Sequence, residues 1–296
     1  MSVPAAYLAV LVIWSTTPLA VAWSSETVHP VMAAWLRMAL AAALGLVLVR
    51  AFGLQLPWHR TALKSYGYAV LGVFGAMFCT YLAVAYVPTG LISVMYGLSP
   101  LLSGLLGQRL LGEKPFAPHQ WIAFILSLGG LAQIFLDDLV LKGDGLPGML
   151  LLVAAVVLFA LSGVMVKRVG ADVHPLPATV GALLVSLPLF GVAWLLLDGT
   201  LPTLDFSSHS PWAILYLATF GSLVGFVCYF YVLRHLPAST VALVTLATPA
   251  FALMLGSWLN DERLTASLVV GSVLITVGLA LYFWGGRWLR PSHRTA

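Results

Sequence analysis

Charged residues are scarce in this chain. They make up 8% of its 296 residues, whereas 61% of the residues are hydrophobic and the mean hydropathy is +1.01. A soluble domain normally carries about 25% charged residues, because its surface has to face water. The shortage of charge therefore excludes a soluble fold of this length and predicts an integral membrane protein.

Cysteine is also scarce, and the histidines are scattered. The two cysteines, Cys79 and Cys228, fall within apolar runs, so we expect packed side chains rather than a disulfide or a metal site. The seven histidines lie in loops or at helix ends, and none is paired at helical spacing. An enzyme centre would need clustered acid–base or metal-binding groups. The sequence thus predicts no enzyme, no metal and no cofactor, and the net charge of +4 reflects membrane topology rather than a nucleic-acid partner.

Long apolar runs are what the sequence has in abundance. A membrane-spanning helix needs about 20 apolar residues, each adding a rise of about 1.5 Å. Ten runs meet this requirement, so the predicted fold is an all-α membrane protein with ten transmembrane helices. The predicted spans are residues 4–22, 30–51, 65–85, 88–110, 119–136, 147–168, 176–197, 211–233, 237–259 and 265–286.

Lysine and arginine are divided unevenly between the two sides of these spans. Of the 14 such residues, 11 lie on the side of the N-terminus, 2 lie on the opposite side, and Arg37 lies inside the second span. Cytoplasmic loops of membrane proteins carry the excess of positive charge. Both termini are therefore predicted to be cytoplasmic.

The chain contains one pattern twice, in residues 96–113 and 245–262. At an offset of 149 residues, each copy has a proline, a glycine and a glutamate in the same places: Pro100 and Pro249, Gly107 and Gly256, Glu113 and Glu262. A half of five spans is odd in number, so the second half enters the membrane from the opposite side. The sequence predicts two inverted five-helix repeats, residues 1–140 and 141–296, a construction typical of secondary transporters. The two glutamates are predicted to be helix-end caps or loop anchors.

Ten spans in two halves, the run Trp14–Pro18 in span one, Arg37 after Pro30, and the repeated Pro–Gly–Glu runs resemble the drug/metabolite transporter superfamily, in particular its EamA-type branch. The resemblance implies a central cavity lined by helices one, three, four, six, eight and nine, with helices five and ten at the periphery. The chain lacks the helix-one glutamate of the small drug exporters in this superfamily. It also lacks the mid-span lysine, in its second half, on which the sugar-phosphate translocators depend. Cationic drugs and phosphorylated substrates are therefore not expected.

Polar and small residues on matched helix faces are candidate substrate contacts. At 100° per residue, Tyr96 and Pro100 share one face of span four, and Thr245, Thr248 and Pro249 share the matching face of span nine. Two interpretations stay open: close packing between small residues, or a substrate cavity where proline leaves a carbonyl free. Further candidates come from the aromatic and hydroxyl residues of spans one, three, six and eight: Trp14, Thr17, Tyr81, Ser162 and Tyr229.

Arg37 is the only charged residue well inside a predicted span. Burying a cation in a membrane is expensive, so the side chain should face a partner, backbone carbonyls or water. One interpretation is a contact with an anionic group of the substrate. The other is a structural arginine that bonds loop or helix-end carbonyls near the outer rim.

The predicted function is secondary transport of a small neutral or zwitterionic metabolite, such as an amino acid. We expect an exporter that works by alternating access across the bacterial inner membrane, as a multi-pass protein. The expected partners are a small-molecule substrate and the lipid bilayer. A fused repeat needs no second copy, so a monomer is expected. A passive channel or facilitator stays open as an alternative, as does, with less support, a membrane-embedded enzyme.

Overall fold

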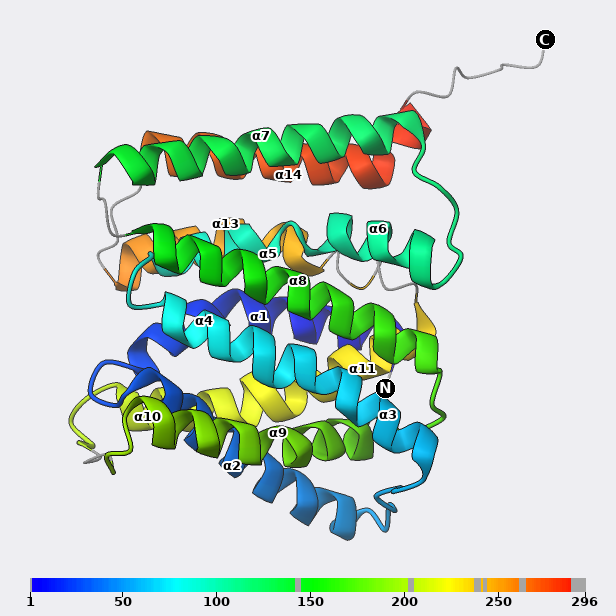
Figure 1. Cartoon of the computed structure of the whole chain (residues 1–296), viewed down its shortest axis with the longest axis vertical. Helices are drawn as coiled ribbons and strands as arrows, with labels where there is room; N and C mark the ends of the chain where they lie inside the picture. Colours follow the sequence, from blue (N-terminus) through cyan, green and yellow to red (C-terminus); the bar gives the residue numbers. More distant parts are fainter. Residues whose placement is uncertain are drawn as a thin grey trace.

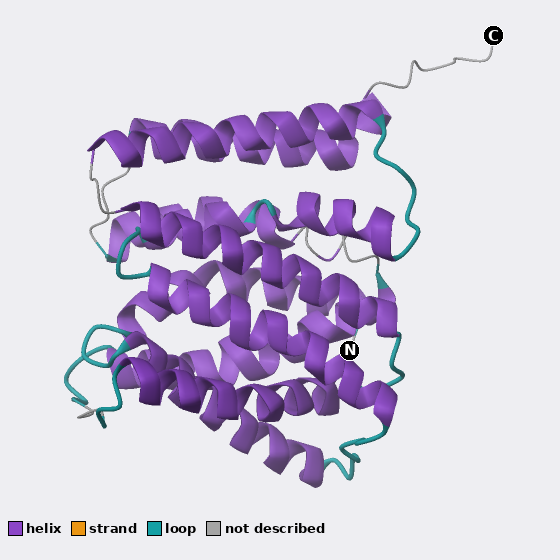
Figure 2. Ribbon diagram, in the orientation of Figure 1, coloured by secondary structure: helices purple, strands orange, loops and turns teal. Residues whose placement is uncertain are grey.

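Helices are the only regular elements in the part of the chain that this computed structural model describes, namely residues 2–141, 145–201, 205–236, 241, 244–260 and 265–288 (Figure 2). Some neighbouring elements follow one another along the chain and form one longer helical rod, and three rods are of this kind. The elements are α1 (Val3–Ser24), α2 (Pro30–Ala51), α3 (Arg60–Val70), η1 (Leu71–Ala76), α4 (Met77–Ala83), α5 (Thr89–Tyr96), α6 (Ser99–Leu110), α7 (Pro118–Leu141), α8 (Gly145–Val169), α9 (Pro175–Leu197), α10 (Ser210–Tyr216), η2 (Leu217–Val224), α11 (Gly225–His235), α13 (Val244–Leu259) and α14 (Ala266–Trp288).

Eight helical stretches among the described residues are long and apolar enough to cross a membrane. They include the rods α3–η1–α4, α5–α6 and α10–η2–α11, each counted as one stretch. The apolar helices α7 and α13 are not among the eight. Large apolar side chains such as Val47, Ile125 and Leu196 are exposed on the outside of the bundle. In a membrane protein, such an apolar surface is the one that faces lipid.

Proline and histidine begin two helices at matched places in the two halves. Pro30 opens α2 and Pro175 opens α9, where the missing N–H of proline removes no helical hydrogen bond. The preceding histidines act as N-caps: Val31 N donates to His29 Nδ1 at 3.4 Å, and Leu176 N donates to His174 Nδ1 at 3.3 Å. The offset between these caps is 145 residues, so the repeat is also present in the local structure of the helix ends.

Matched helices of the two halves also pack against each other. Figure 1 shows α7 lying alongside α14 at one edge of the molecule, and α2 and α9 pack together at the opposite edge. α1 and α8 lie between these pairs. α1 contacts α13 and α11, and α8 contacts η1, α4 and α6. The start of α1 and the end of α14 lie at the same end of the bundle, on the right of Figure 1.

Each half contains a π-helical segment near the middle of its third rod. η1 covers Leu71–Ala76 and η2 covers Leu217–Val224, so an offset of 149 residues brings η1 largely onto η2. A π-helical turn holds an extra residue, which changes the direction in which the following side chains point. The apolar pattern of the sequence did not predict these segments.

The repeated glycine and glutamate end a helix in the first half. Leu111 N and Glu113 N both donate to the carbonyl of Gly107, at 2.9 and 3.2 Å, and Gly112 adopts a φ of +68° that favours glycine. The Glu113 carboxylate folds back over Gly107, where a Cβ would lie 2.5 Å from Oε2. Glu113 is thus anchored at the end of α6, as predicted, whereas Glu262 lies outside the described residues.

Candidate functional site

A small cavity of about 70 Å³ lies at the centre of the bundle. It is lined mainly by aromatic and aliphatic side chains, with a few hydroxyls and one arginine. The lining residues are Trp14, Thr17, Pro18, Val21, Arg37, Met77, Thr80, Ile92, Ser93, Tyr96, Phe159, Gly221, Phe226 and Thr248. Five of the eleven predicted contact residues are among them: Trp14, Thr17, Arg37, Tyr96 and Thr248.

Helices from both halves of the chain line this cavity. α1, α4 and α5 contribute from the first half, and α8, the η2–α11 rod and α13 contribute from the second. These are the six helices that the resemblance implied. α2 is an addition, since Arg37 reaches the cavity from it. α7 and α14 lie at the edge of the bundle, and none of their described side chains lines the cavity (Figure 1).

One wall of the cavity is the part of α1 around Pro18. Pro18 lies inside this helix and has no N–H to donate to the carbonyl of Trp14. Thr17 Oγ1 donates to the carbonyl of Ile13 at 2.8 Å, and Thr16 shares its hydroxyl with Ile13 O at 2.9 Å and Tyr216 OH at 2.5 Å. The hydroxyl–proline run therefore places polar backbone and side-chain atoms in the middle of an apolar helix.

Arg37 is the most unusual side chain at the site, because it is only 1% exposed. Its Nε donates to Ser222 Oγ at 2.7 Å and its Nη1 donates to Tyr81 OH at 3.4 Å. The hydrogen bonds that the structure describes for Arg37 are to hydroxyl groups, not to the loop or helix-end carbonyls that the structural interpretation predicted. Its partners are hydroxyl groups of α4 and η2 inside the bundle, which the π-helical turn of η2 helps to bring there.

Gly221 and Ser222 hold this arginine in place, and neither was among the residues predicted from the sequence. A Cβ on Gly221 would lie 3.2 Å from Arg37 Nη2, so the glycine lets the guanidinium lie close to η2. Ser222 Oγ donates to Met38 Sδ at 3.6 Å, which leaves its lone pairs available to Arg37. The signal in the sequence was weak: a glycine and a serine within an apolar run, with no matching serine in the other half.

Aromatic rings form a cluster at one wall of the cavity. Phe159 lies 5.6 Å, centroid to centroid, from each of Trp14, Tyr96 and Tyr229, with edge-to-face or tilted geometry. Tyr96 OH and Thr80 Oγ1 are hydrogen-bonded at 2.9 Å, which ties α5 to α4. Such contacts restrict ring orientation and provide an apolar surface beside the polar groups of α1 and α2.

Four other predicted contact residues, whose side chains the structure describes, do not reach the cavity lining. Tyr81 is fully buried behind Arg37, and Tyr229 packs behind Trp14 and Phe159. Ser162 donates to the carbonyl of Ala69 at 3.5 Å, at the packing contact between α8 and α3. Pro100 is buried at the start of α6, directly after the break between α5 and α6.

Two predicted residues, Thr245 and Pro249, lie in α13, but their side chains fall outside what the structure describes. α13 runs without interruption from Val244 to Leu259. The break in the fourth rod near Pro100 therefore has no counterpart in the described part of the ninth.

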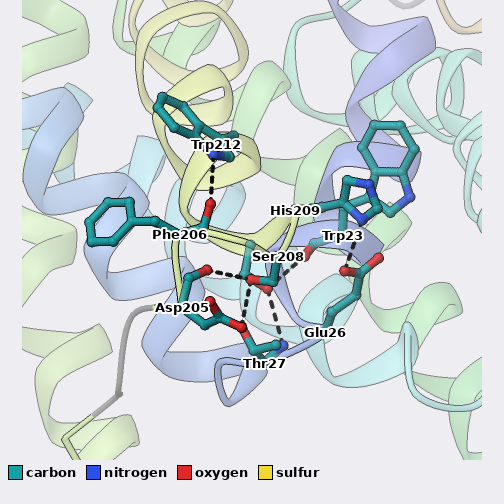
Figure 3. A network of polar contacts seen from close by, with 9 residues as sticks. Trp23, Glu26, Thr27, Asp205, Phe206, Ser208, His209 and Trp212 are labelled. Atoms are coloured by element: carbon teal, nitrogen blue, oxygen red, sulfur yellow. Dashed lines mark hydrogen bonds and ion pairs between the residues drawn. The ribbon is translucent and has the colours of Figure 1, made fainter.

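A polar network joins the two halves at the end of the bundle remote from the N-terminus (Figure 3). Glu26, in the loop after α1, contacts His209 Nδ1 at 3.1 Å, and His209 stacks on Trp23 with centroids 5.0 Å apart. Thr27 N donates to Ser210 Oγ at 3.1 Å, and Ser210 Oγ donates to the carbonyl of Trp23 at 2.9 Å. The α1–α2 loop is thus tied to the start of α10.

Charged contacts lie at the opposite end. Lys167, in the last turn of α8, donates to the carbonyls of Leu233 and Leu236 at the end of α11. Arg234 forms an ion pair with Asp172 in the α8–α9 connection. These residues surround a second, more polar hollow of about 290 Å³ between α3, α8, α9 and α11.

Comparison with known proteins points to one family. The model of the EamA-like transporter family matches the chain twice, over residues 3–136 and 146–284. The chain is 27% identical, over 294 residues, to an Escherichia coli (strain K12) protein named "Probable amino-acid metabolite efflux pump", covering 95% of this chain and 94% of that protein. It is 26% identical, over 286 residues, to the "Uncharacterized inner membrane transporter YedA" of the same organism, covering 94% of this chain and 91% of that protein.

A solved structure supports the fold alone. It matches with a TM-score of 0.72 at 19% sequence identity, and the match covers 97% of this chain and 99% of that one.

Proposed function

The chain belongs to the EamA-like transporter family, and from this premise we propose that it is a secondary transporter of a small neutral or zwitterionic metabolite, such as an amino acid. The observation that carries the proposal is the central cavity. It is lined by α1, α2, α4 and α5 of one half and by α8, η2, α11 and α13 of the other. A site shared by two repeats is the arrangement on which alternating access operates.

The proposed topology has ten spans in two inverted repeats, residues 1–140 and 141–296, with both termini in the cytoplasm. Three findings support it: the twofold family match, the matched π-helical segments, and the start of α1 and the end of α14 at one end of the bundle (Figure 1). α7 and α13 would complete the count of ten, as the fifth and ninth spans. The fused halves supply both walls of the cavity, so the proposed working unit is a monomer.

Alternating access requires the two ends of the bundle to open in turn. With the N-terminus in the cytoplasm, the network of Figure 3 is the outer barrier, and the contacts of Lys167 and Arg234 are at the inner one. Both barriers depend on exposed or partly exposed polar contacts, which are individually weak in water. Such contacts can break and re-form during a transport cycle without a large change in free energy.

Export across the bacterial inner membrane is the proposed direction and place. The names of the two Escherichia coli relatives support them, since one is called an efflux pump and the other an inner membrane transporter. The lining supports a neutral or zwitterionic substrate, because hydroxyls and aromatic rings surround a single charged group. The proposed substrate contacts are Trp14, Thr17, Arg37, Tyr96 and Thr248, together with Thr245 and Pro249, whose side chains are not described. The other four predicted residues are proposed as packing residues outside the lining: Tyr81, Ser162, Tyr229 and Pro100.

Substrate counterflow into proteoliposomes tests the proposal. The panel holds labelled neutral, aromatic, cationic and anionic metabolites, each assayed with and without a pH gradient. A carrier produces saturable counterflow of at least one class. A passive channel or facilitator would instead pass solute without counterflow, and an enzyme would convert the solute rather than move it. Either result, with correctly folded protein, would contradict the proposal.

A further inference from the structure

Arg37 carries a positive charge that no side chain among the described residues neutralises. Among the described residues no carboxylate forms an ion pair with it. The acidic residues that the structure describes lie in connections or toward helix ends, whereas the Arg37 side chain is buried inside the bundle. Burying an unpaired ion costs several kcal/mol, even after local relaxation. A buried residue that lowers the stability of the fold in this way is explained by a function rather than by folding.

The hydrogen bonds of Arg37 leave part of the guanidinium available. A guanidinium has five N–H donors, and the bonds to Ser222 and Tyr81 use one on Nε and one on Nη1. Within the described part of the chain, Nη2 makes no hydrogen bond, although it lies beside Gly221 at the cavity wall. The two hydroxyls therefore hold the group in place while its remaining donors stay open to a ligand.

The charge is also one-sided. The 145-residue offset that relates His29 to His174 makes Ala182 the counterpart of Arg37 in the second half of the sequence. Ala182 is fully buried and apolar. The scaffold is therefore repeated, but among the described lining residues Arg37 is the one cation, and it would orient an asymmetric substrate.

We infer that the substrate is a carboxylate with an apolar body, whose carboxylate pairs with Arg37 while the body lies against the aromatic wall of Trp14, Tyr96 and Phe159. This inference rests on the proposed function and narrows its substrate class. A planar carboxylate matches the fork of a guanidinium and forms short, charge-assisted hydrogen bonds. An α-amino group can lie against the aromatic faces, where a cation is attracted to the ring. Amides and alcohols of the same shape are rejected, because they leave the cation unpaired.

The test compares wild type with Arg37→Met in the full-length protein. The probes are leucine, its amide leucinamide, 4-methylpentanoate, which lacks the amino group, and the matching pair phenylalanine and phenylalaninamide. Two measurements are made on each variant: counterflow in proteoliposomes, and the shift of the thermal unfolding midpoint by each probe in detergent. Arg50→Met, at the exposed end of the same helix, is the matched control.

Wild type is expected to bind and exchange the carboxylates but not the amides. Arg37→Met should weaken carboxylate binding by about 10- to 150-fold, the range of a hydrogen bond to a charged group. Without ligand it should unfold at the same temperature as wild type or a higher one, since an unpaired buried charge has been removed. Arg50→Met should match wild type in both measurements.

The outcomes separate this inference from the proposed function. Equal use of amides and carboxylates, unchanged binding in Arg37→Met, or no stabilisation of wild type by any carboxylate probe would each overturn the role of Arg37. Counterflow of non-carboxylates in such a case would leave a transporter with another substrate class. Carboxylate binding that depends on Arg37, without any counterflow, would support this inference and contradict transport. If Arg37→Met does not fold, Arg37→Lys takes its place in both measurements. Carboxylate binding by Arg37→Lys that equals that of wild type would then make Arg37 a structural residue.

Discussion

Replacement of Gly130 by alanine probes a close backbone contact between α7 and α14. These two helices form the outermost pair of the bundle (Figure 1). A Cβ on Gly130 would lie 2.6 Å from the carbonyl oxygen of Gly271 and 2.9 Å from Leu274 Cβ. Likewise, a Cβ on Gly271 would lie 2.6 Å from the carbonyl oxygen of Gly130. The backbones approach this closely because neither residue has a side chain.

The size of the effect follows from what the new methyl group meets. Ordinary contacts of a Cβ begin at 3.4 Å, so the methyl group is 0.8 Å too close to a backbone atom. A backbone carbonyl cannot rotate away as the end of a flexible side chain can, so the helices have to separate. Overpacking of this kind costs about 1–3 kcal/mol. We expect Gly130→Ala at the upper end of that range.

The neighbouring glycine provides a matched control. A Cβ on Gly129 meets nothing within 4 Å. Gly129→Ala should therefore raise stability by about 0.4–1 kcal/mol, because alanine loses less backbone entropy in a helix. The assay is the thermal unfolding midpoint of each purified variant in the same detergent. Equal shifts for the two variants would refute the view that helix–helix contact, rather than helix propensity, decides the effect.

A functional readout completes this experiment. No described side chain of α7 or α14 contributes to the cavity lining. At temperatures where Gly130→Ala is folded, its apparent KM for a transported substrate should equal that of wild type. A raised KM would mean that the peripheral pair controls the site.

Three further predictions test the helix end, the cavity and the outer loop. Gly107→Ala should lower the unfolding midpoint, because its Cβ meets the Glu113 carboxylate, and Gly107→Ala combined with Glu113→Ala should recover part of the loss. Thr248→Val, which removes a buried hydroxyl at the cavity with little change in size, should raise KM more than it lowers kcat; an unchanged KM would remove Thr248 from the site. The hydrogen bonds from Ser207 Oγ and N lower the pKa of the Asp205 carboxyl below its ordinary value of about 3.9. The stabilisation of this loop is therefore complete above that value and is lost as the pH falls through the lowered pKa. The assay is hydrogen exchange of the Ser207 amide. This amide should be protected at neutral pH, and Asp205→Ala should abolish the protection.

The helices and the repeat were readable from the sequence because each depends on local, one-dimensional information. A run of apolar residues long enough to cross a bilayer has to be helical, since lipid offers no partner for a backbone N–H. The predicted spans 4–22 and 211–233 correspond to α1 and to the α10–η2–α11 rod within two residues at each end. The end of α6 was predictable for the same reason, because the glycine and glutamate that form it are neighbours in the chain.

Part of the candidate site was also predictable. Trp14, Thr17, Tyr96 and Thr248 line the cavity, and each was identified by a polar or aromatic group in an apolar helix at a matched or proline-adjacent position. The same criterion also selected Ser162, which bonds a neighbouring backbone instead. A hydroxyl in an apolar helix has to find a partner, but its sequence context does not say whether that partner is a substrate or another helix.

The sequence alone determined the class of protein, most of its membrane-length helices, the repeated pattern and the presence of one cation well inside a span, because composition and periodicity reflect the lipid solvent directly. Only the tertiary structure decided where that cation lies. Ser222, 185 residues away in the chain, bonds Arg37 from the π-helical segment η2. Tyr81, 44 residues away, bonds it from α4, the helix that follows the π-helical segment η1. Such a pairing depends on how helices rotate and cross when they pack, and no spacing within a single helix records it.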